Sequence, residues 1–221
     1  MTAIDTAPFL GLPHATITLA SASVTRQNIL RAAGVDFNVA PTAIDEARIR
    51  ADAQAGAMAA DEIAVLLAFL KAQAASQILL PIQSPTNSSY IIGCDQLLLI
   101  DDHIMAKPES LTEAKQQMLM LAGKRHELLS AIVLIRDGQR IWHHLGRAAL
   151  TMRKFDDAFA DAYIRRVGEA ALWSSGAYLI DSVGSSLFAR IDGNHFDILG
   201  LPLFPLLGIL HEHGLCPLEA V

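Results

Sequence analysis

Residues 16–34 read TITLASASVTRQNILRAAG, and this stretch decides the fold class. It opens with the β-branched and apolar residues of a short strand. Two serines follow, which can cap a helix over residues 24–33, and Gly34 stands where helices commonly end. A strand that leads directly into a capped helix predicts an α/β protein.

Strands and helices continue to alternate along the rest of the chain. The Asp137-Gly138 pair predicts a tight hairpin turn, so we expect a mixed sheet and not a purely parallel one. Pro81, Pro85 and the residues at 87–89 predict a surface loop. Further strands are expected at 36–40, 90–92, 127–136 and 140–152, with residues 97–100 also extended, and helices at 45–76, 112–122, 156–167 and 202–213.

Composition restricts the possible functions. Of the 221 residues, 52% are hydrophobic and 18% charged, which is enough apolar material for one large domain or two lobes sharing a core. We treat residues 1–221 as one domain with a loose leader at 1–15. The net charge of −6 argues against broad nucleic-acid binding, which needs a basic face.

Location is predicted from the cysteines and the apolar segments. Cys94 and Cys216 form no metal or redox motif and fit a reducing compartment. The N-terminus lacks the basic start of a secretory signal, and the apolar runs are too short or too interrupted to span a bilayer. We therefore expect a cytoplasmic protein without a membrane partner.

The junction between the first strand and helix is a candidate anion site. Ser21, Ser23 and the backbone N–H groups of the helix start stand at the positive end of the helix dipole. Arg26 adds a planar guanidinium suited to phosphate oxygens. An ordinary serine cap with a surface arginine explains the same residues, so this segment alone decides nothing.

Asp95 is the best catalytic candidate from first principles. It follows the apolar residues 90–92, and a carboxylate near the end of a buried strand lies where α/β proteins bind ligands. Gly93 would let backbone approach a substrate closely. Asp45 and Glu46 begin a predicted helix, where acidic residues are common for electrostatic reasons. Lysines 71 and 107 suit phosphate and solvent equally well.

Short motifs follow one another in a characteristic order from residue 16 to residue 214. This series resembles the Maf family of nucleotide pyrophosphatases. The matching segments are 19–26 (L-A-S-x-S-P-R-R in the family), 34–37 with 45–46 (G-x-x-F and D-E), 67–72 (L-A-x-x-K-A), 93–96 (G-A-D-T or G-S-D-Q), 107–108 (G-K-P), 122–126 (S-G-x-x-H), 176–178 (G-A-Y) and 200–203 (G-L-P-L).

The resemblance implies a Maf/inosine-triphosphatase-like α/β fold, an extended mixed sheet with two lobes flanking a cleft. It also implies hydrolysis of a nucleoside triphosphate to the monophosphate and pyrophosphate with a divalent cation (Mg²⁺, Mn²⁺ or Co²⁺), in house-cleaning of non-standard nucleotides. A homodimer is compatible with it. By position, Asp95 and Glu46 would hold the metal or activate water. The triphosphate would be bound by Ser21, Ser23, Arg26, Lys71 and Lys107.

Three positions bear on the substrate. The family's double arginine is Thr25-Arg26 here, its D-T is Asp95-Gln96, and the glutamine of its A-Y-G-I-Q stretch is Asp181. The branch that acts on 7-methyl-GTP carries D-Q and an acidic residue, which this chain resembles more than the dTTP/UTP branch. An acidic side chain suits the donor N–H groups of guanine. The rival hypothesis is a nucleotide-binding regulator of cell division with little turnover.

Overall fold

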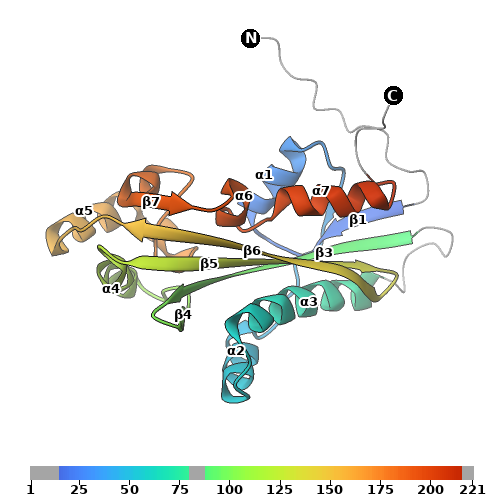
Figure 1. Cartoon of the computed structure of the whole chain (residues 1–221), viewed down its shortest axis with the longest axis horizontal. Coiled ribbons are helices and arrows are strands. Elements are labelled where there is room, and N and C mark those ends of the chain that lie inside the picture. Colours follow the sequence, from blue (N-terminus) through green and yellow to red (C-terminus); the bar gives the residue numbers. More distant parts are fainter. Residues whose placement is uncertain (1–14, 80–87, 216–221) are drawn as a thin grey trace, which may run out of the picture. The chain divides into compact units, whose positions relative to one another are not determined.

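A computed structural model describes residues 15–79 and 88–215 (Figure 1). The strands form a seven-stranded sheet in the order β2-β1-β3-β5-β6-β7, with β4 paired to β3. β1 pairs in parallel with β2 and β3, whereas β4 and β7 pair antiparallel with β3 and β6. The predicted mixed sheet is confirmed. The strands are β1 (Ala15–Leu19), β2 (Asn38–Val39), β3 (Ser88–Ile100), β4 (His103–Met105), β5 (Arg125–Arg136), β6 (Gln139–Met152) and β7 (Phe188–Asp192).

The chain divides into two compact units. The first comprises residues 1–95, 130–146 and 200–221, and the second comprises residues 96–129 and 147–199, so β3, β5 and β6 each contribute to both. The first unit holds the helices α1 (Val24–Ala32), α2 (Glu46–Ala55), α3 (Ala60–Leu79) and α7 (Leu203–Glu212). The second holds α4 (Leu111–Leu121), α5 (Asp157–Val167), α6 (His195–Ile198) and the short 3-10 helices η2 (Gly168–Leu172) and η3 (Val183–Leu187).

In the first unit, α1 and α7 lie on one face of the sheet, and α2 and α3 lie on the other (Figure 1). Helix α3 approaches β3 closely at Gly93. A Cβ atom there would come within 2.1 Å of the Ala68 carbonyl oxygen and 2.8 Å of the Ala72 Cβ. Gly93 therefore lets a helix pack against the strand. This corrects the expectation that its missing side chain makes room for a substrate.

The second unit has an apolar core that includes Met118, Leu121 and Leu150. One polar pair is buried in it: His126 Nε2 lies 3.1 Å from the Tyr178 hydroxyl. Burial lowers the pKa of His126 to about 4, so its imidazole is neutral at physiological pH. The histidine of the S-G-x-x-H motif thus belongs to the core of this unit.

Two expectations about local structure are wrong in detail. The helix expected over residues 45–76 is two helices, because α2 ends at Ala55 with Gly56 as its C-cap, and Ala57 adopts a positive φ of 56° that no α-helix continues. The loop expected over 77–89 ends earlier, since Ser88 and Ser89 belong to β3. Pro81, Pro85 and residues 1–14 lie outside the described residues.

Helix α3 is long and apolar enough, by length and composition alone, to cross a membrane. The expectation that every apolar run is too short or too interrupted to span a bilayer is therefore wrong for α3 by this criterion. In the structure, however, Leu67, Ala68 and Ala72 are fully buried, and the last two contact β3 at Gly93. Lys71, near the middle of the helix, is ion-paired. We interpret α3 as a core helix of the α/β fold.

Candidate functional site

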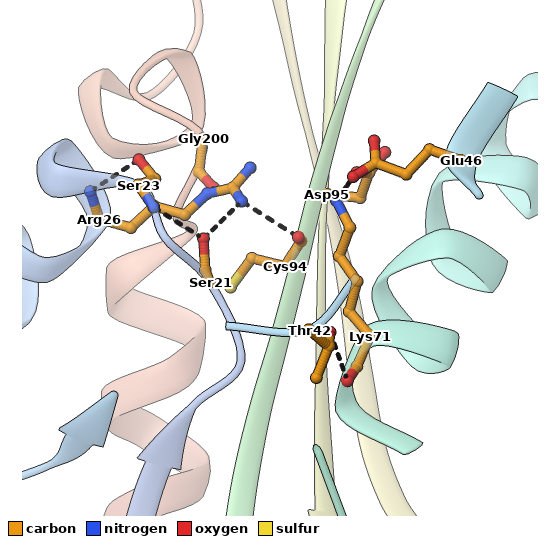
Figure 2. A network of polar contacts seen from close by, with 9 residues as sticks. All are labelled: Ser21, Ser23, Arg26, Thr42, Glu46, Lys71, Cys94, Asp95 and Gly200. Atoms are coloured by element: carbon orange, nitrogen blue, oxygen red, sulfur yellow. Dashed lines mark hydrogen bonds and ion pairs between the residues drawn. The ribbon is translucent and has the colours of Figure 1, made fainter. Parts of the chain in front are cut away.

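Asp95 lies within the long strand β3 and is almost fully buried, with 6% of its side chain exposed. Its neighbour Cys94 is also buried. Because successive side chains of a strand point to opposite faces, the two residues face different helices of the first unit. Figure 2 shows Arg26 on the Cys94 side of β3, and Lys71 with Glu46 on the Asp95 side.

Lys71 connects two carboxylates on the Asp95 side. Its Nζ atom lies 2.6 Å from Asp95 Oδ1 and 2.8 Å from Glu46 Oε1. The lysine comes from α3, the aspartate from β3 and the glutamate from the first turn of α2. Three elements therefore bring two negative charges and one positive charge together, with only 12% of the lysine side chain exposed.

Burial raises the pKa of both neighbours on β3. It raises the pKa of Asp95, while the charge and hydrogen bond of Lys71 and the charge of Arg26 act in the other direction. The ionised form of Asp95 thus depends on its cationic neighbours. Burial raises the pKa of the Cys94 thiol to about 11, so the thiol stays protonated and is no nucleophile at neutral pH.

Arg26 is held from three directions on the other side of β3 (Figure 2). Its Nε–H donates to the Gly200 carbonyl oxygen at 2.8 Å. Its Nη1 atom donates to Ser21 Oγ at 3.2 Å and to the Cys94 carbonyl oxygen at 3.1 Å. These bonds engage Nε and Nη1 and so fix the plane of the guanidinium.

The predicted serine cap is confirmed. Ser23 Oγ accepts a hydrogen bond from the Arg26 backbone N–H at 3.3 Å and so caps α1. Ser21 Oγ accepts from the Ser23 N–H at 3.3 Å as well as from Arg26. Thr25 lies in the first turn of α1. Ser23 thus caps the start of α1, and Ser21 helps to orient the Arg26 side chain.

The acidic pair at 45–46 separates into two roles. Asp45 caps α2 by accepting from the Arg48 N–H at 3.0 Å, whereas Glu46 points to Lys71. The segment before α2 is tied to α3, because the Thr42 hydroxyl donates to the Lys71 carbonyl oxygen at 3.3 Å. Asp45 therefore has the helix-capping role that its position predicts, and Glu46, the next residue, forms an ion pair with Lys71.

The structure gathers Ser21, Ser23, Arg26, Glu46, Lys71 and Asp95 in the first unit. Three predicted residues belong to the second unit. Lys107 is exposed between β4 and α4, and Asp181 is exposed between η2 and η3. Gln96 directs its Nε2 to the carbonyl oxygens of Asp197 and Ile198, at 3.1 and 3.0 Å, and so holds α6.

Sequence reasoning missed the contacts that position the charged side chains. The carbonyl groups of Gly200 and Cys94 hold Arg26, and the Thr42 hydroxyl ties its segment to α3. Residues 200–203 stood out as a motif, but a backbone carbonyl carries no signal of its partner in the sequence. Only the fold shows that residue 200 approaches residue 26.

Comparison with known proteins connects this cluster to a family. The sequence model of the family described as Maf-like protein matches residues 16–213. The chain belongs to the Maf family. Every residue of the cluster lies inside the matched range, and so do the Maf motifs that carried the resemblance.

Curated Maf relatives are similar over almost their whole length. A protein of Rhodospirillum rubrum named nucleoside triphosphate pyrophosphatase is 43% identical over 198 residues, covering 90% of this chain and 95% of the relative. One of Brucella abortus named 7-methyl-GTP pyrophosphatase is 40% identical, covering 89% and 95%. One of Caulobacter vibrioides named nucleoside triphosphate pyrophosphatase is 42% identical, covering 90% and 96%.

Proposed function

We propose that this Maf protein hydrolyses a nucleoside triphosphate to the nucleoside monophosphate and pyrophosphate. The observation that carries the proposal is the buried Asp95, paired with Lys71 and joined by Glu46 within a chain of this family. A structural role alone gives no reason to bury Asp95 beside the Lys71 ammonium, because desolvating such charges is costly. The names of the relatives support the same activity.

The reaction breaks the bond between the α-phosphorus and the oxygen that bridges to the β-phosphorus. A water oxygen forms the new bond to the α-phosphorus, and pyrophosphate leaves with the electron pair. Charge grows on the leaving group, so cationic donors near it lower the barrier. In our proposal Arg26 offers the positive charge of its oriented guanidinium to the phosphates, and Lys71 and Lys107 add mobile positive charges. Ser21 and Ser23 shape the α1 start that faces the phosphates.

Glu46 and Asp95 are the residues that would hold the divalent cation that this reaction implies. Within residues 15–79 and 88–215, no group of three or more His, Cys, Asp or Glu side chains is placed to bind a metal. Two carboxylates still fit an ion such as Mg²⁺, which binds through one or two carboxylates, water and substrate phosphates. When bound, such an ion neutralises charge on the phosphate oxygens.

For the base, we propose a guanine nucleotide of the 7-methyl-GTP kind over dTTP and UTP. Asp181 is the residue that would read guanine, by accepting from its N1–H and N2–H₂ groups. Gln96 contributes indirectly, since both N–H groups of its amide face the backbone of α6. Thr25, in place of an arginine, removes one contact. Replacing Asp181 with glutamine (Asp181→Gln) should move the preference toward dTTP and UTP, and a wild-type preference for those two would overturn this assignment.

The decisive experiment measures pyrophosphate release from a panel of nucleoside triphosphates, including 7-methyl-GTP, with Mg²⁺, Mn²⁺ or Co²⁺. Asp95→Asn should abolish metal-dependent release. The matched control is Asp102→Asn, because Asp102 is exposed in the β3–β4 turn at a positive φ of 63° that asparagine tolerates. Nucleotide binding without release from any member of the panel would favour the regulator of cell division instead.

Two wider predictions accompany this function. We propose a cytoplasmic protein, to be tested by fractionation, and a homodimer, to be tested by light scattering of the purified chain. Neither is needed for the chemistry, because the residues that carry the proposal belong to one chain.

A further inference from the structure

Lys71 lies between the two carboxylates that would hold the metal ion. Its ammonium lies 2.6 Å from Asp95 and 2.8 Å from Glu46. A cation held by the same two carboxylates would compete with this ammonium for their negative charge. The lysine and the metal therefore cannot both hold Glu46 and Asp95 in this way.

We propose that Lys71 is a built-in substitute for the metal, which the incoming cation displaces and which then binds the triphosphate. This inference rests on the proposed function. Lys71 then has two successive sets of partners. It pairs with the carboxylates in the free protein, and with the phosphates once the metal holds the carboxylates.

The burial of Asp95 explains why a substitute for the metal is needed. Asp95 is 4% exposed, and a buried carboxylate without a counter-charge is strongly unfavourable. Lys71 supplies that counter-charge before the metal arrives. A lysine suits this role because its ammonium is a compact charge on a flexible four-carbon stem, so it can change partners without movement of α3.

Exchange of partners also couples the two ligands. A metal that takes the carboxylates leaves the ammonium without a counter-ion, and a triphosphate provides one. Metal and nucleotide should then each favour binding of the other, as any two ligands do that stabilise the same state of a protein. Arg26, fixed by three hydrogen bonds, does not take part in this exchange.

The first test labels lysines in the wild-type protein without nucleotide. An amine-acylating reagent is applied with and without saturating Mn²⁺, and modification is quantified for each lysine by mass spectrometry. Displacement predicts that Mn²⁺ raises the labelling rate of Lys71 by about threefold or more, as its ammonium leaves the buried pair. Lys115, which lies between the exposed Asp157 and Asp161, is the internal control and should not change.

The second test measures Mn²⁺ affinity by calorimetry without nucleotide. Lys71→Met should bind Mn²⁺ about tenfold more tightly than wild type, because the metal no longer displaces a charge-assisted hydrogen bond. Lys115→Met should match wild type. Unchanged labelling of Lys71 at saturating Mn²⁺ would overturn the proposal, and so would equal or weaker affinity in a folded Lys71→Met. The labelling test needs no variant, so it decides the matter even if Lys71→Met does not fold.

Pyrophosphate release from wild type, measured in parallel, separates this inference from the proposed function. Pyrophosphate release with unchanged Lys71 labelling would support the proposed function and contradict displacement of Lys71 by the metal. Increased Lys71 labelling without pyrophosphate release from any nucleotide would support displacement of Lys71 and contradict the proposed pyrophosphatase activity.

Discussion

Two lysines of this protein lie between two carboxylates at almost the same distances, and their surroundings differ. Lys71 is 2.6 and 2.8 Å from Asp95 and Glu46, and Lys115 is 2.8 and 2.7 Å from Asp157 and Asp161. The side chain of Asp95 is 6% exposed and that of Asp157 is 70% exposed, whereas Glu46 and Asp161 are alike at 43% and 42%, so the contrast lies in one carboxylate of each pair. The hydrogen bonds that Lys115 donates to these two aspartates raise its pKa.

The comparison shows that distance alone does not distinguish a functional cluster from a surface ion pair. An exposed pair gains little, because water and salt screen its charges and two side chains lose freedom. A buried pair changes the protonation of its members and the stability of the fold. Lys115 joins two helices of the second unit, whereas Lys71 joins a strand and two helices of the first.

The largest contrast is expected in activity. Asp95→Asn should lower kcat for pyrophosphate release about 10³-fold, in the range that loss of an acid–base or metal-holding group produces. Asp157→Asn, the matched change at the exposed pair, should alter kcat by less than about twofold. Steady-state assays with both variants test this. Similar losses at the two positions would show that the comparison misplaces the chemistry.

Stability should separate the two lysines next. Lys71→Met should lower the free energy of unfolding by about 3 kcal/mol near neutral pH, because a buried carboxylate loses its partner. Lys115→Met should leave the urea unfolding midpoint almost unchanged. Urea titrations followed by circular dichroism measure both. Equal shifts for the two variants would mean that burial does not set the strength of these pairs.

The Lys71→Met loss should also depend on pH. Burial raises the pKa of Asp95 above the ordinary value of 3.8, and removal of Lys71 removes the largest opposing influence. A raised folded-state pKa favours folding below the unfolded value and loses that contribution as pH rises through the folded value. The loss should therefore grow as pH rises from about 4 toward neutral in Lys71→Met. Unfolding measured across this range, with Lys115→Met as control, tests the sign.

The sequence predicted the order of the elements well, because most boundaries carry local signals. Ser23 and Gly34 mark the ends of α1, and Asp137-Gly138 marks the hairpin between β5 and β6. The division of residues 45–76 into two helices was missed, because Gly56 can occur within a helix and the left-handed conformation of Ala57 has no signal in an alanine.

For the candidate site, the sequence supplied residue types and the family resemblance supplied their grouping. That Lys71 reaches both Glu46 and Asp95 depends on where α3 crosses β3, which tertiary packing decides. The Gly93 interpretation failed for the same reason. A glycine indicates close approach of something, and only the fold shows that it is a helix.

Gly93→Ala should test how Lys71 is positioned. The new methyl group would clash with α3 at Ala68 and Ala72, so the helix must shift away from β3. We expect a loss of about 2 kcal/mol, typical of overpacking, together with reduced activity. Gly208→Ala in α7 is the matched control, since its Cβ meets nothing within 4 Å. It should stabilise the helix by about 0.5 kcal/mol. A neutral Gly93→Ala would show that α3 is free to move.

The smallest expected effect is a dependence on salt, and it addresses the cause of the difference directly. The Debye length falls from about 10 Å at 0.1 M salt to about 3 Å at 1 M, which weakens exposed charge pairs far more than buried ones. Any difference in unfolding midpoint between wild type and Lys115→Met should therefore vanish as NaCl rises. The difference between wild type and Lys71→Met should persist, because solvent does not reach the contact between Nζ and Asp95. If salt removed both differences, water would have to enter the cluster freely, and Lys71 would then be no more committed to Asp95 than Lys115 is to its two aspartates.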